Sequence, residues 1–520
     1  MSPLRVAVAA PNRHAAEAGA QAVEAGGNAV DAALAAILVA LVSEPGTASL
    51  GGGAFVTVAP AGRPAVTVDG TVSMPGRGLP RAAFGRGLHR IEMPYGGGTV
   101  TEVGHGSVAT PGALAAFELA HREHARLPWR EVVAPAAHRS HAGFPLSASA
   151  ARYLGFAREA IFDRDPGIRA ALRGPDGSPL RPGDTVHLPD LGDFLDLVAA
   201  EGAAALSAGD VAAAIAADMA ANGGLVTAED LAAYRPIVRP ALTLRLSDWE
   251  LATNPPPAVG GPVLAAMLLL LEEGLRAGEV DPAQRVAELV AVQRAVLSHR
   301  VRDLETAPDL EAAVTAMLDS ITGAGPAWNR SPSTVHVSAV DSAGTACAAT
   351  SSSGYGSGVV APGTGVWLNN SLGERELNRR GLHVLPPGER LVSNMSPTVG
   401  RRADGAVLAV GSPGGDRIAT AVLQTLLPLM GGEVSLQTAV DAPRLHVACD
   451  DSGQPVRVEY EADLRRPAGV ASDLPWREHP ARSMFFGGVG AAMLDGERLL
   501  AAADPRREGA VAVSATAPSG

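Results

Sequence analysis

The sequence predicts a layered fold of the α/β type, because short strands are mixed with long helices. Alternating apolar and polar residues indicate strands at 54–60, 65–70, 241–246, 335–350, 365–370 and 406–412. Helical periodicity dominates up to about residue 325, for example over 111–133 and 209–224. With 520 residues, the chain is long enough to bury a large core.

The helical segments carry their own signals. Residues 32–42, "AALAAILVALV", are apolar throughout, which predicts a buried core helix that is too short to cross a bilayer. Segment 209–224 ends on two glycines, as expected just past a helix C-terminus. Segment 321–333 is rich in Gly, Pro, Ser and Asn, so we expect it to be exposed and flexible.

A hairpin is predicted directly after that segment. Val335, Val337 and Ala339 alternate with polar residues, a turn follows at "DSAG", and a second strand-forming run begins at Thr345. Thr334 therefore lies where a loop meets a strand. A hydroxyl in that position can be an ordinary strand edge or, if the chain is cut before it, a new chain terminus.

Composition excludes several classes of function. The net charge of −12 and the pI of about 5.6 argue against nucleic acid or an anionic membrane as the main partner. The chain has no lysine, so all 42 basic residues are arginine and a lysine nucleophile or Schiff base is excluded. The N-terminus lacks an apolar leader with a cleavage site, and we expect a cytoplasmic protein.

Two pairs of histidines are candidate metal ligands. His121 and His124 are three residues apart on one predicted helix, and His138 and His141 have the same spacing. Neither pair has a nearby set of carboxylate partners, which favours solvated helix faces. We expect no metal site.

Other cofactor motifs are weak. Cys347 and Cys449 are far apart and match no metal-ligand spacing or disulfide framework. Residues 356–361, "GSGVVA", loosely fit a dinucleotide fingerprint, but Pro362 follows where a helix should begin. We expect no cofactor.

A series of segments along the chain carries a family resemblance. They include "GGNAVDAALAA", "SLGGGAF", "ATPGALAAF", "NGGLVTAEDLAAYRP" and "NPPPAVGG", then "STVHVSAVDSAGTACAATSSS", "GVWLNN", "VSNMSPT", "GSPGGDRIATAVLQTLL" and "DAPRLH". In this order the chain resembles the γ-glutamyltranspeptidase family, N-terminal nucleophile hydrolases that cleave themselves before a threonine. Each segment alone is a weak signal, whereas the ordered series is specific.

The resemblance implies a four-layer αββα sandwich of the N-terminal nucleophile hydrolase type, made as a precursor that is cleaved into two chains. The cut would fall between Ser333 and Thr334. Residues 1–333 would form a helix-rich large subunit that contributes one sheet layer, and residues 334–520 a small subunit. The two fragments would stay together as one compact heterodimer.

Elementary chemistry fits a cut at that place. A threonine hydroxyl is a poor nucleophile until a base takes its proton, and the free α-amino group of Thr334, titrating near ~7.7 to 8.0, would be that base. Before cleavage the same nitrogen is an amide without useful basicity. The resemblance further implies that Ser352 bonds the nucleophile's oxygen and that Gly414 and Gly415 supply N–H groups to the oxyanion.

The donor-binding positions depart from the family pattern. Thr71 stands where the family has an arginine for the donor α-carboxylate, and Gly354 stands in place of an asparagine. A hydroxyl cannot imitate a bidentate, charge-assisted contact, so a different donor is expected. If the binding site for the donor α-carboxylate lies elsewhere in this chain, Arg77 and Arg375 are the candidates to form it. The full set of expected substrate-binding residues is Thr71, Gly354, Asn370, Ser371, Glu374, Ser393 and Asn394.

These departures favour a hydrolase of specialised metabolism, and the lack of a recognisable signal peptide favours an intracellular one. Some relatives also differ from the family pattern at the donor-binding residues. They include acylases of β-lactam side chains and homologues in actinobacterial antibiotic pathways that hydrolyse a carbon–carbon bond in 4-alkylproline precursors. The alternatives are a γ-glutamyltranspeptidase or glutathione hydrolase, an acylase, and an uncleaved scaffold. The expected partners are a small-molecule acyl donor with water or an amine acceptor, and neither nucleic acid nor membrane.

Overall fold

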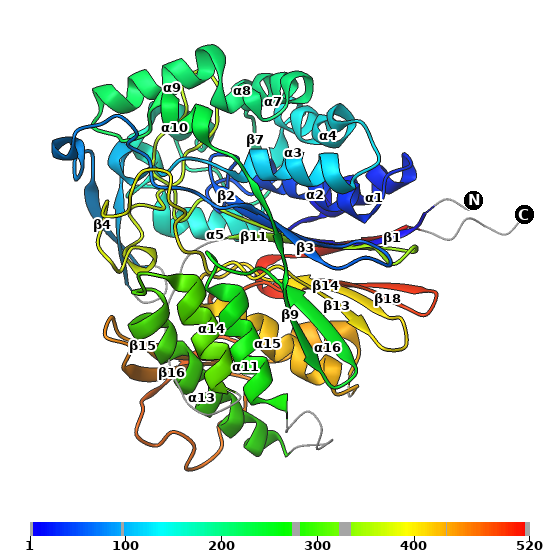
Figure 1. Cartoon of the computed structure of the whole chain (residues 1–520). Coiled ribbons are helices and arrows are strands. Elements are labelled where there is room, and N and C mark those ends of the chain that lie inside the picture. Colours follow the sequence, from blue (N-terminus) through cyan, green and yellow to red (C-terminus); the bar gives the residue numbers. More distant parts are fainter. Residues whose placement is uncertain (1–3, 95–97, 273–280, 322–333, 433, 515–520) are drawn as a thin grey trace, which may run out of the picture.

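The protein is described by a computed structural model that covers residues 4–94, 98–272, 281–321, 334–432 and 434–514. Two sheets face one another, and helices cover the outer face of each (Figure 1). The expected four-layer αββα arrangement is confirmed. Among the described helices, none combines the length and the apolar character needed to cross a membrane.

The first sheet holds the strand that follows Thr334. Its order is β20-β1-β11-β12-β2-β3-β8, and every neighbouring pair is antiparallel. The strands are β1 (Val6–Ala10), β2 (Gly53–Ala59), β3 (Val66–Gly70), β8 (Ile237–Pro240), β11 (Val335–Asp341), β12 (Ala346–Ser352) and β20 (Ala510–Val513). Strand β11 pairs with β12 from Val335 onward and with β1 from Ser338 onward, so its first residue is held by β12.

The second sheet has the order β19-β18-β14-β13-β10-β9. Small apolar side chains such as Ala7, Ala348, Ala409 and Ala492 form the core between the two sheets, which allows the sheets to pack closely. The strands are β9 (Leu242–Leu246), β10 (Trp249–Thr253), β13 (Thr398–Arg402), β14 (Val407–Gly411), β18 (Gly490–Asp495) and β19 (Arg498–Ala503).

Helices α1 to α3 pack directly on the first sheet, and α4 and α7 to α10 lie outside them (Figure 1). The helices in this half are α1 (Arg13–Glu24), α2 (Ala29–Ser43), α3 (Ala113–His124), α4 (Trp129–Ala142), α5 (Ala148–Ala157), α6 (Pro166–Ala171), α7 (Pro189–Glu201), α8 (Ala204–Ser207), α9 (Gly209–Ala221) and α10 (Ala228–Ala233).

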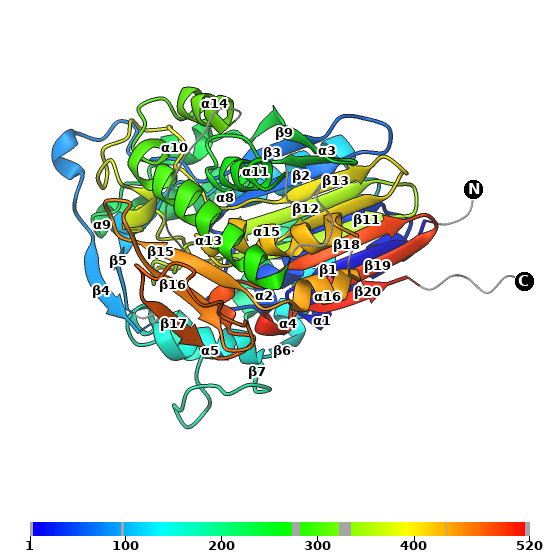
Figure 2. The ribbon, with the colours of Figure 1, turned by 90° about the horizontal axis from the view of Figure 1, so that it is seen from below.

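The helices of the second half cross the outer face of the six-stranded sheet, with a small sheet, β15 to β17, beside them (Figure 2). These helices are α11 (Gly260–Leu270), α13 (Pro282–His299), α14 (Leu310–Ile321), α15 (Arg417–Met430) and α16 (Leu436–Asp441). The remaining strands are β4 (His89–Met93), β5 (Thr99–Val103), β6 (Phe144–Pro145), β7 (Thr185–Val186), β15 (Leu445–Cys449), β16 (Pro455–Glu461) and β17 (Trp476–His479).

The predicted core helix at 32–42 is the body of α2, which is buried along its whole length. Its start is fixed by a reciprocal cap. The Asn28 Oδ1 atom accepts N–H bonds from Val30 (2.8 Å) and Asp31 (3.2 Å), while the Asp31 carboxylate accepts the Asn28 N–H (2.8 Å). A short polar cap thus allows a wholly apolar helix to begin inside the protein.

Most of the predicted strands are confirmed, namely 54–60, 65–70, 241–246, 406–412 and the hairpin at 335–350. The prediction for 365–370 is wrong, because that segment makes only isolated bridges, from Trp367 to Val360 and from Leu368 to Gly51. The helical pattern at 111–133 is two helices, α3 and α4, separated by a break that includes Pro128. Of the segment expected to be exposed, 321–333, residues 322–333 lie outside the described residues.

Candidate active site

Thr334 immediately precedes β11 and is only 2% exposed. The register places Val335 opposite Ser351 of β12, and β1 flanks the other edge of the strand. Two small cavities meet at Thr334. A residue at the start of an inner strand is held rigidly, which suits a group that has to be aimed at a substrate.

The first cavity, here called the Thr334 cavity, has a volume of about 20 Å³. Segments that are far apart in the sequence, from Gly53 to Met395, converge on it. Besides Thr334, its lining contains six residues that the sequence analysis selected: Thr71, Ser352, Ser371, Glu374, Ser393 and Asn394.

Thr71 lies just past the end of β3 and is held by three hydrogen bonds. Its N–H donates to Asp69 Oδ1 (3.0 Å), and its carbonyl accepts from the Tyr234 hydroxyl (2.6 Å) and from Arg390 Nη1 (2.8 Å). Asp69 is itself paired with Arg239 (2.9 Å). The wall of the cavity at this point therefore offers a neutral hydroxyl.

Ser393 and Asn394 are positioned by the start of α11. The N–H groups of Val259 and Gly260 donate to the Ser393 carbonyl (2.8 and 3.2 Å), and a side chain at Gly260 would lie 2.1 Å from the Asn394 carbonyl oxygen. The Asn394 side chain is buried, and neither its nitrogen nor its oxygen has a hydrogen-bond partner in the described part of the chain. Leaving both groups of a buried amide unpaired is costly, so this amide is suited to a polar ligand.

Glu374 brings a carboxyl group into the same cavity. It is 1% exposed, and its Oε2 atom has no hydrogen-bond partner among the described residues. Burial raises the pKa of Glu374 well above its ordinary value, and the nearby Glu376 raises this pKa further. Burial also raises the pKa of Glu376 to about 7, although a hydrogen bond from Tyr355 opposes that shift. The raised pKa favours the protonated form of Glu374, which can donate a hydrogen bond.

Gly354 and Asn370 do not line the Thr334 cavity but stand behind Glu374. A side chain on Gly354 would lie 2.4 Å from Glu374 Oε1, so glycine leaves room for the carboxyl group. The Asn370 side chain is fully buried and bonded to the Tyr355 N–H (2.7 Å) and to the Thr101 hydroxyl (3.1 Å). Asn370 is thus occupied by structural contacts, whereas the family resemblance implied that it binds substrate.

Ser352 is the last residue of β12, opposite Gly53 of β2, and its hydroxyl accepts the N–H of Gly354 (3.2 Å). Ser333, the residue before the expected cut, lies outside the described residues. The expected bond between Ser352 and Thr334 stays a prediction.

Gly414 and Gly415 form the turn that leads into α15. Both have positive φ values, +129° and +65°, which favour glycine. Within the described part of the chain, neither N–H donates a hydrogen bond, while both carbonyls accept from the first turn of α15. Free amides at the positive end of a helix suit an anion, and the oxyanion role remains a prediction.

The second cavity, here called the Glu44 cavity, has a volume of about 30 Å³ and contains Glu44, His336 and Arg507 as well as Thr334. Glu44 accepts hydrogen bonds from Asn12 Nδ2 (2.7 Å) and the Ser147 hydroxyl (2.8 Å). Burial raises the pKa of Glu44 to about 7, and these two bonds limit the rise. No motif in the sequence indicated Glu44, because it stands only as the polar residue at the end of an apolar helix.

His336 was also missed. Its ring is bonded to the Thr350 and Ser338 hydroxyls, both at 2.8 Å, and burial lowers its pKa to about 3. The histidine is therefore neutral. A polar residue inside an otherwise buried strand was the available signal.

The two arginines named as candidates for binding the donor α-carboxylate are paired with carboxylates of the protein. Arg77 Nε lies 3.7 Å from Asp230 Oδ1, and Arg375 Nη2 lies 2.5 Å from Glu102 Oε1. Neither lines the Thr334 cavity.

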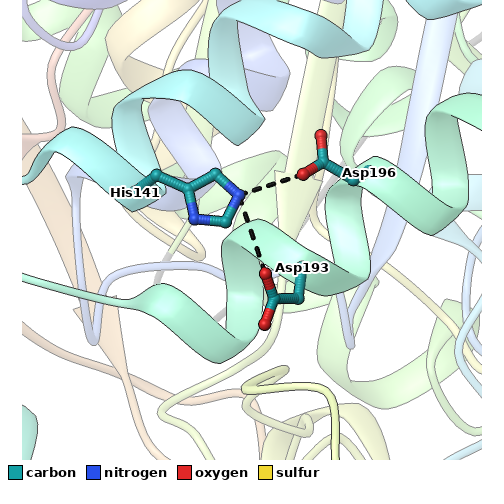
Figure 3. A group of neighbouring side chains, drawn as sticks. All are labelled: His141, Asp193 and Asp196. Carbon is teal, nitrogen blue, oxygen red and sulfur yellow. Dashed lines mark hydrogen bonds and ion pairs between the residues drawn. The ribbon is translucent and has the colours of Figure 1, made fainter.

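The expectation that neither histidine pair has carboxylate neighbours is wrong for His141. Its Nε2 atom lies 3.0 Å from Asp196 Oδ2 and 3.9 Å from Asp193 Oδ1, both on α7 (Figure 3). The sequence could not reveal this group because α7 reaches α4 only through packing. All three side chains are exposed on the outer helices, as in an ordinary surface ion pair.

Four layers, with a hydroxyl residue at the start of an inner strand, are features of the N-terminal nucleophile hydrolases. The family model described as gamma-glutamyltranspeptidase matches residues 15–514. The chain therefore belongs to the γ-glutamyltranspeptidase family and is an enzyme of the N-terminal nucleophile hydrolase class.

Individual relatives are moderately similar. The chain is 31% identical over 455 residues to the Acylase ACY 1 proenzyme of a Pseudomonas species (strain V22), covering 83% of this chain and 80% of that one. It is 28% identical over 545 residues to the glutathione hydrolase proenzyme of Pseudomonas aeruginosa, covering 97% and 93%. A crystal structure of cephalosporin acylase from Bacillus halodurans superposes with a TM-score of 0.77 at 23% identity, covering 98% and 96%, which shows a shared fold.

Proposed function

We propose that this enzyme is an autoprocessing hydrolase whose nucleophile is Thr334, and that its donor is not a γ-glutamyl compound. We assign it to specialised biosynthesis, as the altered donor-binding positions favour. The observation that carries the proposal is the Thr334 cavity, where Thr71 stands in place of the expected arginine and no described lining residue is basic. The word proenzyme in the names of two relatives supports the processing step.

Processing makes the catalytic base. The Thr334 oxygen attacks the Ser333 carbonyl carbon, the Ser333–Thr334 C–N bond breaks, and Ser333 becomes an ester on that oxygen. Water then hydrolyses the ester, which leaves a Ser333 carboxylate and a Thr334 residue with a free hydroxyl and a free α-amino group.

The same oxygen then serves the donor. The α-amino group takes the hydroxyl proton while the oxygen attacks the donor carbonyl, and the N–H groups of Gly414 and Gly415 hold the resulting oxyanion. The ammonium returns its proton to the leaving group, which departs and leaves an acyl ester on Thr334. Water attacks this ester, releases the acid and restores the enzyme. A nitrogen or a carbon leaving group fits this scheme, provided that it accepts the proton.

The Thr334 cavity selects against γ-glutamyl donors because none of its described lining residues is basic. A γ-glutamyl donor carries an α-carboxylate that needs a cationic partner, and each lost charge-assisted contact costs about 1.5 to 3 kcal/mol. Thr71, Ser371 and Ser393 offer hydroxyls, and Asn394 offers an unpaired amide. A side-chain acylase is the second candidate, because acylase proenzymes of Pseudomonas are 31% identical to the chain.

A denaturing gel of the purified protein tests the processing step. We expect two fragments, residues 1–333 and 334–520, and a single intact band for Thr334→Ala. An intact wild-type chain would instead support an uncleaved scaffold.

A donor panel tests the substrate class. It compares γ-glutamyl-p-nitroanilide and glutathione with non-amino-acid amides and with β-diketones, in which a carbon–carbon bond is cut. We expect kcat/KM for the γ-glutamyl donors to be lower by on the order of 1000-fold than for the best donor of the panel. Efficient glutathione hydrolysis would overturn the non-γ-glutamyl assignment.

A further inference from the structure

A third cavity adjoins the Thr334 cavity. It is here called the Arg390 cavity and has a volume of about 180 Å³, and it shares Leu377 and Val392 with the Thr334 cavity. These two apolar side chains are therefore the boundary between the two spaces. The Thr334 cavity alone, at about 20 Å³, holds no more than a short head group.

The Arg390 cavity has room for a ring and an apolar lining to receive it. A cavity of about 150 Å³ can bind benzene. Besides the two shared residues, Pro257, Leu310 and Leu385 supply apolar surface. The position next to the cavity of the nucleophile makes this space an extension of the active site.

The lining also carries three arginines against two glutamates. Arg379 is paired with Glu305 (2.7 Å) and with Asp451 (3.0 Å), and Arg380 lies 3.6 Å from Glu389. Both of these cations are therefore already matched by carboxylates.

Arg390 differs from the other two, because no carboxylate of the described residues lies within ion-pair distance of it. Its guanidinium donates to the carbonyls of Thr71 (2.8 Å) and Arg235 (2.5 Å) and stacks over the Tyr234 ring at 4.1 Å. A guanidinium carries five N–H groups, so donors remain for a ligand. Arg390 does not line the Thr334 cavity itself, but its bond to the Thr71 carbonyl places it next to a residue that does.

Backbone contacts hold this arginine in place. Arg390 forms a bridge with Ser73, and the neighbouring N–H of Leu391 donates to the Val72 carbonyl (3.1 Å). The cation is thus fixed beside the site, where it costs little further ordering to bind an anion.

We propose that the Arg390 cavity binds the far end of the acyl group of the donor, and that this end combines a ring or short apolar chain with a carboxylate that pairs with Arg390. The proposal rests on the proposed function, since it assumes that Thr334 attacks the acyl carbonyl. The head of the acyl group then passes Glu374 and Asn394 in the Thr334 cavity, and the leaving group faces the Glu44 cavity.

Binding of small probes tests the anion site without requiring catalysis. Isothermal titration compares benzoate with its neutral analogue benzamide on the processed wild type and on Arg390→Gln. We expect benzoate to bind the variant about 10- to 100-fold more weakly, as for the loss of one charge-assisted contact, with benzamide unchanged. Equal benzoate affinity in the two proteins, or no benzoate binding to the wild type, overturns the proposal.

Hydrolysis provides the second measurement. Phenylalkanoyl p-nitroanilides with linkers of different length carry either a carboxylate or a carboxamide on the ring. We expect Arg390→Gln to raise KM about 10- to 100-fold for the carboxylate donors and to leave the carboxamide donors unchanged, with partial rescue in Arg390→Lys. The control Arg245→Gln removes an exposed arginine of β9 and should match the wild type.

The outcomes separate the two proposals. An equal loss for carboxylate and carboxamide donors would show that Arg390 only supports Thr71, and this would overturn the anion site while leaving the Thr334 chemistry intact. A chain that stays uncut and hydrolyses no donor would contradict the proposed function, whereas selective benzoate binding would still support the anion site.

Discussion

At the scale of single residues, the absence of lysine allows the α-amino group of Thr334 to be labelled selectively after cleavage. The intact chain has one primary amine, at its N-terminus, because it contains no lysine. Cleavage before Thr334 creates one more, and this amine is the proposed catalytic base. Amine-reactive reagents therefore report directly on the catalytic group.

We predict that acetylation of the processed enzyme modifies two peptides, the N-terminal one and the one that starts at Thr334, whereas Thr334→Ala shows only the first. Loss of activity should follow the modification of Thr334, because an amide nitrogen cannot take the hydroxyl proton. Peptide mass spectrometry at several reaction times measures both quantities. Full activity with an acetylated Thr334 would exclude its amine as the base.

Glu44 yields a prediction for stability. The unfolded chain releases the Glu44 proton near pH 4.5, whereas burial keeps the pKa of Glu44 at about 7 in the folded protein. Between these values the folded state binds more protons, so the contribution of Glu44 is fully present below pH 4.5 and is lost as the pH rises to 7. The loss amounts to about 3 kcal/mol.

Glu44→Gln provides the comparison, because glutamine can keep both contacts with Asn12 and Ser147 but cannot titrate. The free energy of unfolding, measured by denaturant titration at several pH values, should fall for the wild type relative to the variant between pH 4.5 and 7. Parallel curves would mean that Glu44 titrates normally in the folded protein.

Residue identity alone could predict only part of the site. Six of the selected residues line the Thr334 cavity because they are local to motifs with a fixed order along the chain. Arg390 was not predicted, since its guanidinium reaches the Thr71 carbonyl across 319 residues and no local pattern records that contact. Arg77 and Arg375 were named as candidates for binding the donor carboxylate, but both are paired with carboxylates of the protein.

At the scale of elements, the turn before α15 allows a matched test of the oxyanion role. A side chain on Gly414 would lie 2.9 Å from the Gly487 backbone, at a φ of +129°. Gly405, in the turn between β13 and β14, has a φ of +96° but no atom within 4 Å of such a side chain.

We predict that Gly414→Ala lowers kcat/KM by on the order of 100-fold to 1000-fold, because the turn must shift and its N–H groups then no longer point at the oxyanion. Gly405→Ala should cost about 1 kcal/mol of stability from backbone strain, with normal kcat/KM. The measurements are kcat/KM on the best donor of the panel and the thermal midpoint. Equal activity in the two variants would place the oxyanion donors elsewhere.

Elements were predictable where the signal is local. The hairpin at 335–350 follows from alternation and a turn within one stretch, and α2 follows from one apolar run with a polar cap. Segment 365–370 has the composition of a strand, yet it pairs only through single residues, Trp367 with the nearby Val360 and Leu368 with the distant Gly51. Tertiary partners decide such cases, and propensity does not.

At the scale of the whole molecule, the two proposed fragments are interleaved. In the seven-stranded sheet, residues 1–333 supply β1, β2, β3 and β8, while residues 334–520 supply β11, β12 and β20. Strand β1 therefore lies between two strands of the other fragment. The six-stranded sheet is also shared, through the pairing of β10 with β13.

We predict that the fragments do not separate after cleavage under native conditions. Size-exclusion chromatography at nanomolar concentration should give one peak that contains both fragments, because dissociation would break ladders in both sheets. Each fragment expressed alone should be insoluble or unfolded, since its strands would lose their neighbours. Recovery of a folded, soluble single fragment would contradict this arrangement.

The pairing of β1 with β20 also constrains when the enzyme can mature. Ala7 lies opposite Val513, so β1 waits for a partner strand that is made about 500 residues later. The sheet that positions Thr334 cannot close while the C-terminal segment is still inside the exit tunnel. Maturation should thus wait until β20 has been made, and stalled nascent chains that lack residues 510–513 should remain uncut.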